Sequence, residues 1–414
     1  MERRSFLSGL LSAGALSGGG VTALRAEDAL PPVRAVTKGP KFHWFGYYDK
    51  QQFDASDRYL LGMQVDFEHR SPRADDELRL GMVDLGDGDR WRELGTSKAW
   101  SWQQGCMLQW VPGRPDEVIW NDRRDGQFVS HVMNVASGKR RTLPMPIYAL
   151  APNGKWAVTT DFARLNDTRP GYGYAGIPDP NRDVKIPGNT GIWRMDLESG
   201  KCTQIVSLAD AAAVPNINKD VEGAKHWFNH LLVNTDGTRI CFLHRWRDGI
   251  GQKKSFSTRF FTANPDGSEP FVIDPYGGTS HFIWRDPTHI MAWAIHPSHG
   301  EKFYLYKDRT DQVEVVAPDI MTVNGHNTYL PPGSEWVLCD TYPDKNRNQN
   351  PYIYNTRTAR RVWLGHFHSP KEYTGEWRCD THPRASRNGK MVCVDSTHGG
   401  NGRQMYVIDI RSLV

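Results

Sequence analysis

The sequence lacks several features that mark other classes of protein. No apolar run reaches the 18 or so residues that a membrane-spanning helix needs, so we expect no membrane span. The 51 Lys and Arg are scattered among 47 Asp and Glu, and without a basic block the formal net charge of +4 argues against a nucleic-acid partner. The six cysteines include no Cys-x-x-Cys pair, which argues against a zinc ribbon. Disulfide pairing and oligomeric state stay open.

The N-terminus carries the pattern of an export signal. Arg3 and Arg4 are followed by Ser-Phe-Leu and then by a weakly apolar stretch rich in Leu, Ala, Gly and Ser as far as Ala23. This order is typical of a twin-arginine signal peptide, with a chance arginine pair on a tail as the alternative. We therefore expect residues 1–26 to be removed and the protein to be exported to the periplasm or the extracellular space.

A unit of about 40–50 residues recurs along the rest of the chain. In five of the units a turn of the Asn-Gly, Asp-Gly or Pro-Gly kind precedes a β-rich run, and two divergent units have Ser-Asp or Asp-Pro at this place. Asn-Gly and Asp-Gly turns supply the positive φ that tight hairpins need. Seven copies are recognisable, and a period of this length with several strands per copy is typical of β-propellers. The seven turns lie at Ser56-Asp57, Pro112-Gly113, Asn153-Gly154, Asp236-Gly237, Asp286-Pro287, Pro332-Gly333 and Asn388-Gly389.

These repeats predict an all-β fold, a single-domain seven-bladed β-propeller over residues 27–414. Two long inserts rich in Pro, Gly and Asn, at 165–189 and 215–225, interrupt the repeats, and we expect them to form loops over one face of the ring. The expected blades cover approximately residues 43–97, 103–144, 147–208, 227–275, 279–317, 324–365 and 380–412.

Four histidines occupy the same position in four consecutive units. His230, His281, His326 and His382 each lie six residues before the turn position of their unit. In a propeller the first strand of every blade lines the central channel, so equivalent positions converge near its axis. Neutral imidazoles gathered there suit a metal site or acid–base chemistry, whereas four separate local hydrogen bonds are the structural alternative.

Other residues near this column are candidates for substrate contacts and proton transfer. Arginines can pair with a carboxylate through two hydrogen bonds, and Tyr342 follows the first long strand of its blade, where its hydroxyl could donate a proton. His43 and Tyr48 belong to an aromatic segment that we expect to enter the first blade and line the same face. The arginines and the adjacent histidine are Arg245, Arg247, Arg384 and His244.

The chain resembles the oligogalacturonate lyase family and its propeller relatives, which include ulvan lyases and some α-L-rhamnosidases. The resemblance rests on Asp380-Thr-His-Pro-Arg384 ahead of an Asn-Gly turn and on the three earlier histidines, and it is clearest over residues 226–412. It implies that His230 is the base and that the later histidines, His281, His326 and His382, bind manganese near the substrate carboxylate. The glutamine that the family places three residues before a ligand histidine is replaced here by Val323 or Cys379, so zinc and calcium stay open as alternatives.

The expected reaction is β-elimination next to a uronic acid in an acidic polysaccharide or oligosaccharide. Once a metal or an arginine neutralises the substrate carboxylate, His230 can remove the adjacent proton, with Tyr342 and Arg384 completing the catalytic group. Two alternatives stay open. A glycoside hydrolase needs two carboxylates, for which Asp49, Asp340 and Asp380 are available. A non-catalytic propeller could bind a glycan or a protein with the same surface.

Overall fold

The computed structural model describes residues 29–217, 221, 223–247 and 256–414. The predicted signal peptide, residues 1–26, lies outside the described residues, as does part of the second insert. Among the helices in the described part of the chain, none is long and apolar enough to span a membrane.

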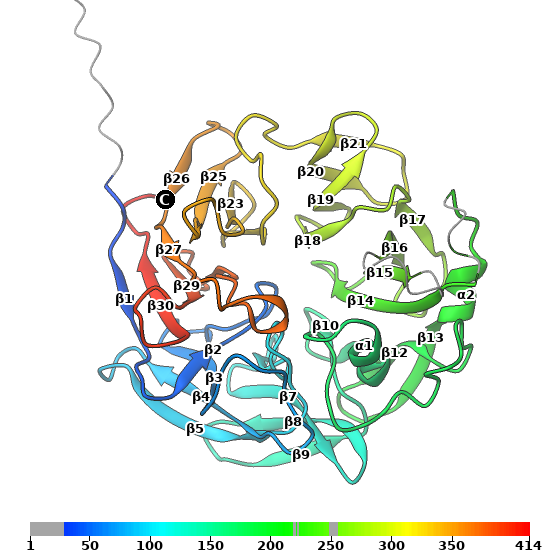
Figure 1. Ribbon diagram of the computed structural model, residues 1–414, viewed down its shortest axis with the longest axis horizontal. Coiled ribbons are helices and arrows are strands. Elements are labelled where there is room, and N and C mark those ends of the chain that lie inside the picture. The colour runs from blue at the N-terminus through cyan, green and yellow to red at the C-terminus, as the bar shows by residue number, and fades with distance from the viewer. Residues whose placement is uncertain (1–28, 218–220, 222, 248–255) are drawn as a thin grey trace, which may run out of the picture.

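Seven four-stranded antiparallel sheets are arranged around a ring in the described residues, as Figure 1 shows. The prediction of an all-β seven-bladed propeller is therefore confirmed. Six sheets run in chain order from their innermost strand outward. They are β2–β5 (Phe42–Trp44, Tyr59–Val65, Leu78–Asp84, Arg90–Ser97), β6–β9 (Gln109–Trp110, Glu117–Arg124, Gln127–Asn134, Arg140–Leu143), β10–β13 (Ala149–Leu150, Trp156–Thr160, Gly191–Asp196, Cys202–Ser207), β14–β17 (Lys225–Val233, Ile240–Arg247, Ser257–Ala263, Phe271–Asp274), β18–β21 (Ser280–Trp284, His289–His296, Gly300–Lys307, Val313–Val315) and β22, β23, β25 and β26 (Thr328–Tyr329, Trp336–Cys339, Tyr352–Asn355, Arg361–Trp363).

The last sheet joins the two ends of the described chain. It consists of β28 (Arg384–Ala385), β29 (Met391–Ser396) and β30 (Gln404–Asp409), with β1 (Val33–Ala35) added as its outer strand. The pairing of β1 with β30 is antiparallel, with Val33 opposite Ile408. This pairing closes the ring, because one sheet contains strands from both ends of the described chain. The sequence analysis did not predict it, because the segment carries no repeat signal of its own.

The predicted glycine turns join the first two strands of their blades and also touch neighbouring blades. Gly154, Gly237 and Gly389 have φ values of 62°, 78° and 69°, which L residues with a side chain adopt at a cost. A Cβ atom on Gly154 would lie 2.1 Å from the carbonyl oxygen of Pro112, in the equivalent turn of the preceding blade. These turns therefore need glycine for both backbone conformation and blade packing.

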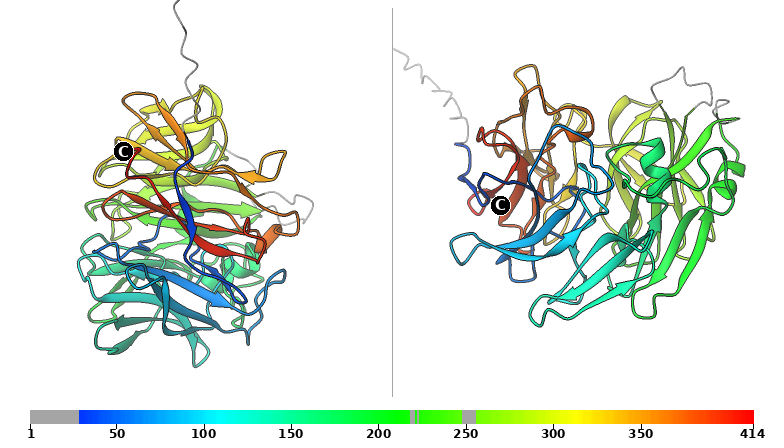
Figure 2. Two further views of the ribbon diagram at one scale, coloured as in Figure 1. Left: turned by 90° about the vertical axis from the view of Figure 1, so that its left-hand side faces the viewer. Right: turned by 60° about the horizontal axis from the view of Figure 1, so that its bottom comes forward.

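The first insert folds into a short helix and a loop over one face of the ring. Helix α1 (Phe162–Thr168) begins at Asp161, whose side chain accepts hydrogen bonds from two backbone N–H groups of the first turn. The buried Arg164 forms an ion pair with Asp179 at 3.0 Å and donates to the carbonyl oxygen of His226 on β14. Figure 2 (right) shows α1 on the upper face of the blades. The insert is thus held against the blade that carries His230.

The remaining elements are small. Helix α2 (Leu208–Ala213) begins at Ser207, which forms a capping box with Asp210. β24 (Asn348–Gln349) pairs with β27 (Phe367–His368), and a 3-10 turn, Gly375–Trp377, precedes the last blade.

Candidate active site

The structure brings the four column histidines together. The ring centroids of His281 and His326 are 4.3 Å apart, and those of His326 and His382 are 4.2 Å apart. His230 joins them through Tyr47, whose ring stacks on His230 at 5.0 Å and lies 5.1 Å from His382. All four histidines are buried. We call His230, His281, His326 and His382 the histidine cluster.

Local backbone irregularities direct these side chains to the centre of the ring. The register of β14 against β15 shifts at His230, and that of β18 against β19 shifts at His281, so each histidine is the extra residue of a β-bulge. His230 and His382 also have positive φ values, 51° and 39°. Such conformations cost free energy in residues other than glycine and gather at functional sites.

Asp340 fixes the orientation and the tautomer of His326. Both carboxylate oxygens lie 3.0 Å from Nδ1 of His326, and one of them also accepts from the His326 backbone N–H at 2.7 Å. Thr381 donates its hydroxyl proton to the other oxygen. With Nδ1 directed at Asp340, His326 presents its Nε2 on the opposite side of the ring, and this atom is buried without a hydrogen-bond partner. A carboxylate behind an imidazole is the usual support for a metal-binding histidine.

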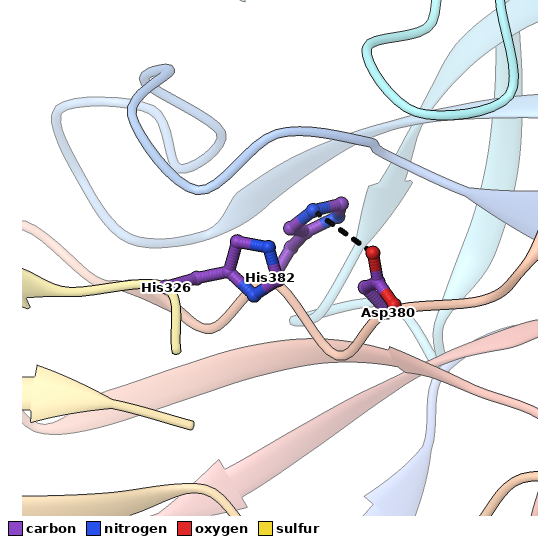
Figure 3. A group of neighbouring side chains, drawn as sticks. All are labelled: His326, Asp380 and His382. Atoms are coloured by element: carbon purple, nitrogen blue, oxygen red, sulfur yellow. Dashed lines mark ion pairs between the residues drawn. The ribbon is translucent and has the colours of Figure 1, made fainter. Parts of the chain in front are cut away.

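Two further groups lie next to the free nitrogen of His326. Nε2 of His382 is likewise buried without a hydrogen-bond partner, and it lies 3.9 Å from Oδ2 of Asp380 (Figure 3). Ligand atoms of His326, Asp380 and His382 all lie within 4.8 Å of one another. Arg378 holds Asp380 in place, with 2.6 Å between its Nε and Oδ2. Two imidazole nitrogens and a carboxylate oxygen form a donor set that first-row divalent metals accept.

His281 lies beside this group, but its nitrogens have other contacts. Nδ1 is 2.9 Å from Oδ1 of Asn324, and Nε2 is 3.3 Å from the hydroxyl of Tyr342. The resemblance implied a ligand set of three histidines, whereas the group of potential ligands in the described residues contains Asp380 in place of His281. Burial lowers the pKa of both His281 and His382 well below its ordinary value, so both are neutral at neutral pH.

His230 is connected to this group of ligands through Tyr47, whose ring contacts both His230 and His382. Its Nδ1 is 3.4 Å from the hydroxyl of Tyr148 and 3.5 Å from Nε2 of Gln104. Burial, together with the positive charge of Arg245, lowers the pKa of His230 well below its ordinary value. His230 is therefore a neutral imidazole that can accept a proton.

Arg378 and Tyr172 complete the site, and sequence reasoning did not single out Arg378. The guanidinium of Arg378 donates to the Tyr172 hydroxyl at 2.8 Å, and the Tyr172 ring meets His230 edge-on at 5.4 Å. Burial alone would raise the pKa of Tyr172, but Arg378 and Arg169 outweigh it and lower that pKa. Tyr172 comes from the insert after α1, which sequence reasoning placed over this face.

Tyr342 and Tyr48 also lie at the histidine cluster. The Tyr342 ring is 5.9 Å from that of His281 and 5.6 Å from that of His326, and burial raises the pKa of its hydroxyl, so it stays protonated. The Tyr48 ring is 5.4 Å from His326, but its hydroxyl donates to the carbonyl oxygen of Phe282 at 3.0 Å. Tyr48 thus contributes its ring to the site, while its hydroxyl proton is held in the hydrogen bond to the backbone.

Arg384, which we expected to be catalytic, is a positioning residue. It forms two hydrogen bonds with Asp395, at 2.8 and 3.1 Å, and a third with Gln52 at 2.8 Å. It also donates to the carbonyl oxygens of His382 and Gly46, and the residue is only 2% exposed. Its donors are therefore occupied within the protein, where they hold the strained His382 backbone and the segment leading to Tyr47.

Arg384→Met is expected to lower the free energy of unfolding by about 3–5 kcal/mol, because it leaves the buried Asp395 carboxylate without its counter-ion. Urea denaturation measures this loss. Arg411→Met is the matched control, since Arg411 pairs with Asp409 on the surface and its side chain is 70% exposed. We expect the control to change stability by less than about 1 kcal/mol. Equal stability of the two variants would contradict this role for Arg384.

The remaining expected substrate contacts divide into two groups. His43 and His244 lie outside the cluster: His43 is buried between Gln64 and Gln404, and His244 contacts His226 at 2.7 Å and Arg259 at 3.1 Å. Adjacent residues of a strand point to opposite faces, so His244 and Arg245 cannot both face the site. Arg245 is buried at the cluster, where its charge acts on His230 and His281. Arg247 lies over the ring of Trp227 at 5.7 Å.

The protein resembles known proteins in its three-dimensional structure. No protein-family model and no curated protein matches the sequence. An oligogalacturonate lyase in complex with manganese is similar with a TM-score of 0.67 and 13% identity, over 93% of this chain and 94% of that one. An oligogalacturonate lyase from Vibrio parahaemolyticus has a TM-score of 0.63 and 14% identity, over 92% and 94%. This likeness establishes the fold.

The propeller domain of the Trilobed protease from Pyrococcus furiosus is also similar, with a TM-score of 0.51 and 11% identity over 88% of this chain and 96% of that one. That domain is described as having an open Velcro topology, whereas β1 closes the ring here. Propellers of this shape therefore occur in lyases and in a protease, and the fold does not decide the reaction.

Proposed function

We propose that this protein is a metal-assisted lyase that cleaves an acidic oligosaccharide or polysaccharide next to a uronic acid. One observation carries the proposal: the two buried, unpartnered Nε2 atoms of His326 and His382 lie beside Asp380, and the ring of Tyr47 contacts both His382 and the neutral His230. The similarity to an oligogalacturonate lyase in complex with manganese supports the substrate class and the choice of manganese. Zinc and calcium remain the alternatives to test.

The donor set fits a divalent cation. A buried polar atom without a partner costs about 1–3 kcal/mol, and two such nitrogens face one carboxylate here. His326, Asp380 and His382 would hold the ion, with Asp340 and Arg378 orienting them from behind. A cation bound there would supply a Lewis acid that withdraws charge from the substrate carboxylate and so acidifies the adjacent C–H bond.

His230 is the proposed base of the elimination. Its neutral imidazole takes the proton from C5 of the uronic acid, and the electrons of that C–H bond form the C4–C5 double bond as the C4–O bond to the neighbouring sugar breaks. Stacking on Tyr47 and the contact of Nδ1 with Tyr148 fix the ring plane of His230. The base is therefore held rigidly beside the proposed carboxylate site.

Tyr342 is the proposed acid. The departing sugar oxygen needs a proton, and burial keeps the Tyr342 hydroxyl protonated at neutral pH by raising its pKa. This hydroxyl lies 3.3 Å from Nε2 of His281, which accepts its hydrogen bond before the reaction. The same contact can orient the hydroxyl again after it has been reprotonated. Tyr48 cannot take this role, since its proton is directed to a backbone carbonyl.

A glycoside hydrolase remains the second enzyme class, but the carboxylates at the site have other contacts. Asp340 accepts hydrogen bonds from His326 and Thr381, and Asp380 forms an ion pair with Arg378. Hydrolysis needs one carboxylic acid and one free carboxylate placed across the bond. Because Asp340 and Asp380 are both engaged in other contacts, the site favours elimination over hydrolysis.

We also propose that the protein acts outside the cytoplasm, after removal of the signal peptide predicted at residues 1–26. An acidic polysaccharide is an extracellular substrate, which agrees with export. N-terminal sequencing of the protein recovered from the periplasm or the culture medium tests this point.

The direct test of the reaction is the ultraviolet absorbance of an unsaturated uronide. Protein loaded with manganese should generate this absorbance from pectate oligosaccharides, from ulvan or from another uronate-containing glycan. New reducing ends without the absorbance would select a hydrolase instead. Absence of both signals with every acidic glycan, metal supplied, would reject catalysis and favour a binding protein.

The pH dependence of kcat/KM should reflect the lowered pKa of His230. The base acts in its neutral form, so activity should stay constant from about pH 8 down to the ordinary histidine pKa of 6.5 and decline only below it. Burial raises the pKa of Tyr342 above its ordinary value of 10.0, so this acid keeps its proton over the same pH range and causes no loss of activity below pH 10.0. Initial rates at low substrate concentration measure the profile. An acid limb at or above pH 6.5 would contradict His230 as the base.

A further inference from the structure

Gln103 lies at the tip of a tight turn between the first two blades. Ser101 and Gly105 pair through two backbone hydrogen bonds, at 2.9 and 3.1 Å, and so close the turn on either side of it. The neighbouring Trp100 and Trp102 are buried, and their indole N–H groups donate to backbone carbonyls at 3.1 and 2.7 Å. A buried turn that is bonded in this way is a rigid base from which Gln103 can hold other parts of the chain.

Gln103 bonds to two irregular segments that come from distant parts of the sequence. Its backbone N–H donates to the carbonyl oxygen of Gly171, next to Tyr172, at 3.3 Å. Its side-chain Nε2 donates to the carbonyl oxygens of Glu376 at 2.8 Å and of Arg378 at 3.2 Å. One residue therefore fastens together the two segments whose side chains, Tyr172 and Arg378, form a hydrogen bond next to the histidine cluster.

The contact depends on an amide at this place. The NH2 group of a glutamine carries two hydrogens, which match two carbonyl oxygens that lie two residues apart in one segment. Gln103 is only 1% exposed, and its Oε1 is buried without a hydrogen-bond partner. Flipping the amide would turn this oxygen toward the two carbonyl oxygens, so these oxygens fix the orientation of the Gln103 side chain.

The position of Arg378 affects two parts of the proposed site. Its Nε lies 2.6 Å from Oδ2 of Asp380, a potential metal ligand. Its guanidinium also donates to the hydroxyl of Tyr172 at 2.8 Å, and the ring of Tyr172 meets His230 edge-on. A displacement of the Arg378 backbone would therefore disturb both the ligand and the tyrosine next to the proposed base.

Arg403 provides a second anchor for the segment that carries Arg378. It donates to the carbonyl oxygen of Trp377 at 2.7 Å and forms an ion pair with Glu68 at 2.8 Å. Arg403 thus holds the segment to the first and last blades, whereas Gln103 holds it to the Tyr172 segment. The two anchors have different effects, since only a shift relative to Tyr172 changes the contact of Arg378 with the tyrosine hydroxyl.

We propose that Gln103 is a positioning residue of the site, which acts through Arg378: it fixes this guanidinium where it both orients Asp380 and holds the hydroxyl of Tyr172. For the part played by Asp380, the inference rests on the proposed function. The contact between Arg378 and Tyr172 can be measured without metal or substrate.

The first experiment measures manganese affinity by calorimetry. Gln103→Met keeps the length of the side chain and removes its two donors, so it should weaken manganese binding about tenfold to a hundredfold. Gln109→Met is the matched control, because Gln109 is also buried and donates to one backbone carbonyl, that of Met107, at 3.2 Å. The control should bind manganese as the wild type does. Wild-type affinity in Gln103→Met would overturn the proposal.

A double-mutant cycle separates positioning from a general loss of packing. In the Arg378→Met background the group through which Gln103 acts is already absent, so adding Gln103→Met should change manganese affinity by less than about twofold. A further loss of about tenfold in that background would show that Gln103 acts on the fold alone, and would overturn the proposal. Gln103→Asn keeps the amide but is one methylene shorter, and it takes the place of Gln103→Met with the same expected results if that variant does not fold.

The second experiment follows the ionisation of Tyr172 in the protein without metal or sugar. Burial raises the pKa of Tyr172, but Arg378 and Arg169 outweigh it and lower that pKa below its ordinary value of 10.0. The ultraviolet absorbance of tyrosinate should therefore show a step below pH 10.0 that Tyr172→Phe removes. Gln103→Met should move this step to higher pH, because the guanidinium withdraws from the hydroxyl, and Gln109→Met should leave it in place. An unmoved step in Gln103→Met would overturn the proposal.

These results distinguish failure of this inference from failure of the lyase proposal. A wild-type protein that binds no manganese would reject the proposed function, and a Tyr172 step that moves in Gln103→Met would still support the positioning role. Equal manganese affinity of the wild type and Gln103→Met, with unsaturated product from both, would reject the positioning role and keep the lyase.

Discussion

His230→Asn is expected to lower kcat by about 10²–10⁴-fold and to leave bound metal unchanged. The imidazole is the proposed proton acceptor, and it stands apart from the group formed by His326, Asp380 and His382. Asparagine is the suitable replacement because residue 230 has a φ of 51°, and asparagine tolerates the left-handed region better than most residues. Steady-state kinetics with metal in excess measures the effect.

The control for this substitution is His366→Asn. His366 is an exposed histidine that contacts Asn350 outside the cluster, so its replacement should leave kcat within about twofold of the wild-type value. A wild-type kcat in His230→Asn would exclude it as the base. Tyr172, whose hydroxyl is held by Arg378 and whose ring touches His230, would then be the first alternative.

His326→Ala is expected to abolish both tight metal binding and activity, a loss of several kcal/mol in transition-state stabilisation, or about 10³-fold or more in rate. His326 contributes one of the two unpartnered nitrogens, and its removal leaves only His382 and Asp380 in the group. Chelation of the wild-type protein should produce the same loss, and manganese should restore it in the wild type alone. Activity after chelation and after each metal addition gives the result.

A matched variant separates loss of the ligand from loss of its support. Asp340→Asn keeps an oxygen near Nδ1 of His326 but removes the negative charge behind the imidazole, so it should weaken metal binding by about 10–100-fold and be rescued by added metal. Full activity of His326→Ala in the presence of a chelator would contradict the metal-assisted account.

Much of the fold could be predicted because the turns repeat. Asn-Gly and Asp-Gly turns restrict the backbone locally, as the positive φ of Gly237 and Gly389 shows, and their spacing counts the blades without tertiary information. The closing strand could not be found this way. Val33–Ala35 is three residues long and has no turn before it, and its place beside β30 follows only from ring closure.

The sequence could predict those site residues that occupy equivalent positions in successive blades. It could not predict residues whose role depends on the direction of the side chain. The histidine column follows from equal positions in equal blades, and the four rings do meet. Arg384 is two residues from His382, but its side chain binds the buried carboxylate of Asp395. No sequence pattern indicates this pairing. His43 likewise points between blades, toward Gln64 and Gln404.

Residues brought in by irregular segments were the hardest to predict. Arg378 follows a 3-10 turn, and Tyr172 follows α1, yet the two side chains meet across the face of the ring at 2.8 Å. The sequence analysis named Asp380 only as a carboxylate available to a hydrolase, whereas its Oδ2 lies 3.9 Å from Nε2 of His382, a residue with a left-handed backbone. Loops carry no periodic signal, so their contribution to a site becomes visible only in three dimensions.

The metal content of the purified protein tests the central claim most directly. After equilibration with manganese or zinc and removal of free ions, elemental analysis should find a single bound divalent ion per chain in the wild type. The double variant His326→Ala/His382→Asn should retain none under the same conditions. A wild-type protein that is active and free of metal, or a double variant that keeps its full complement of metal, would contradict the account.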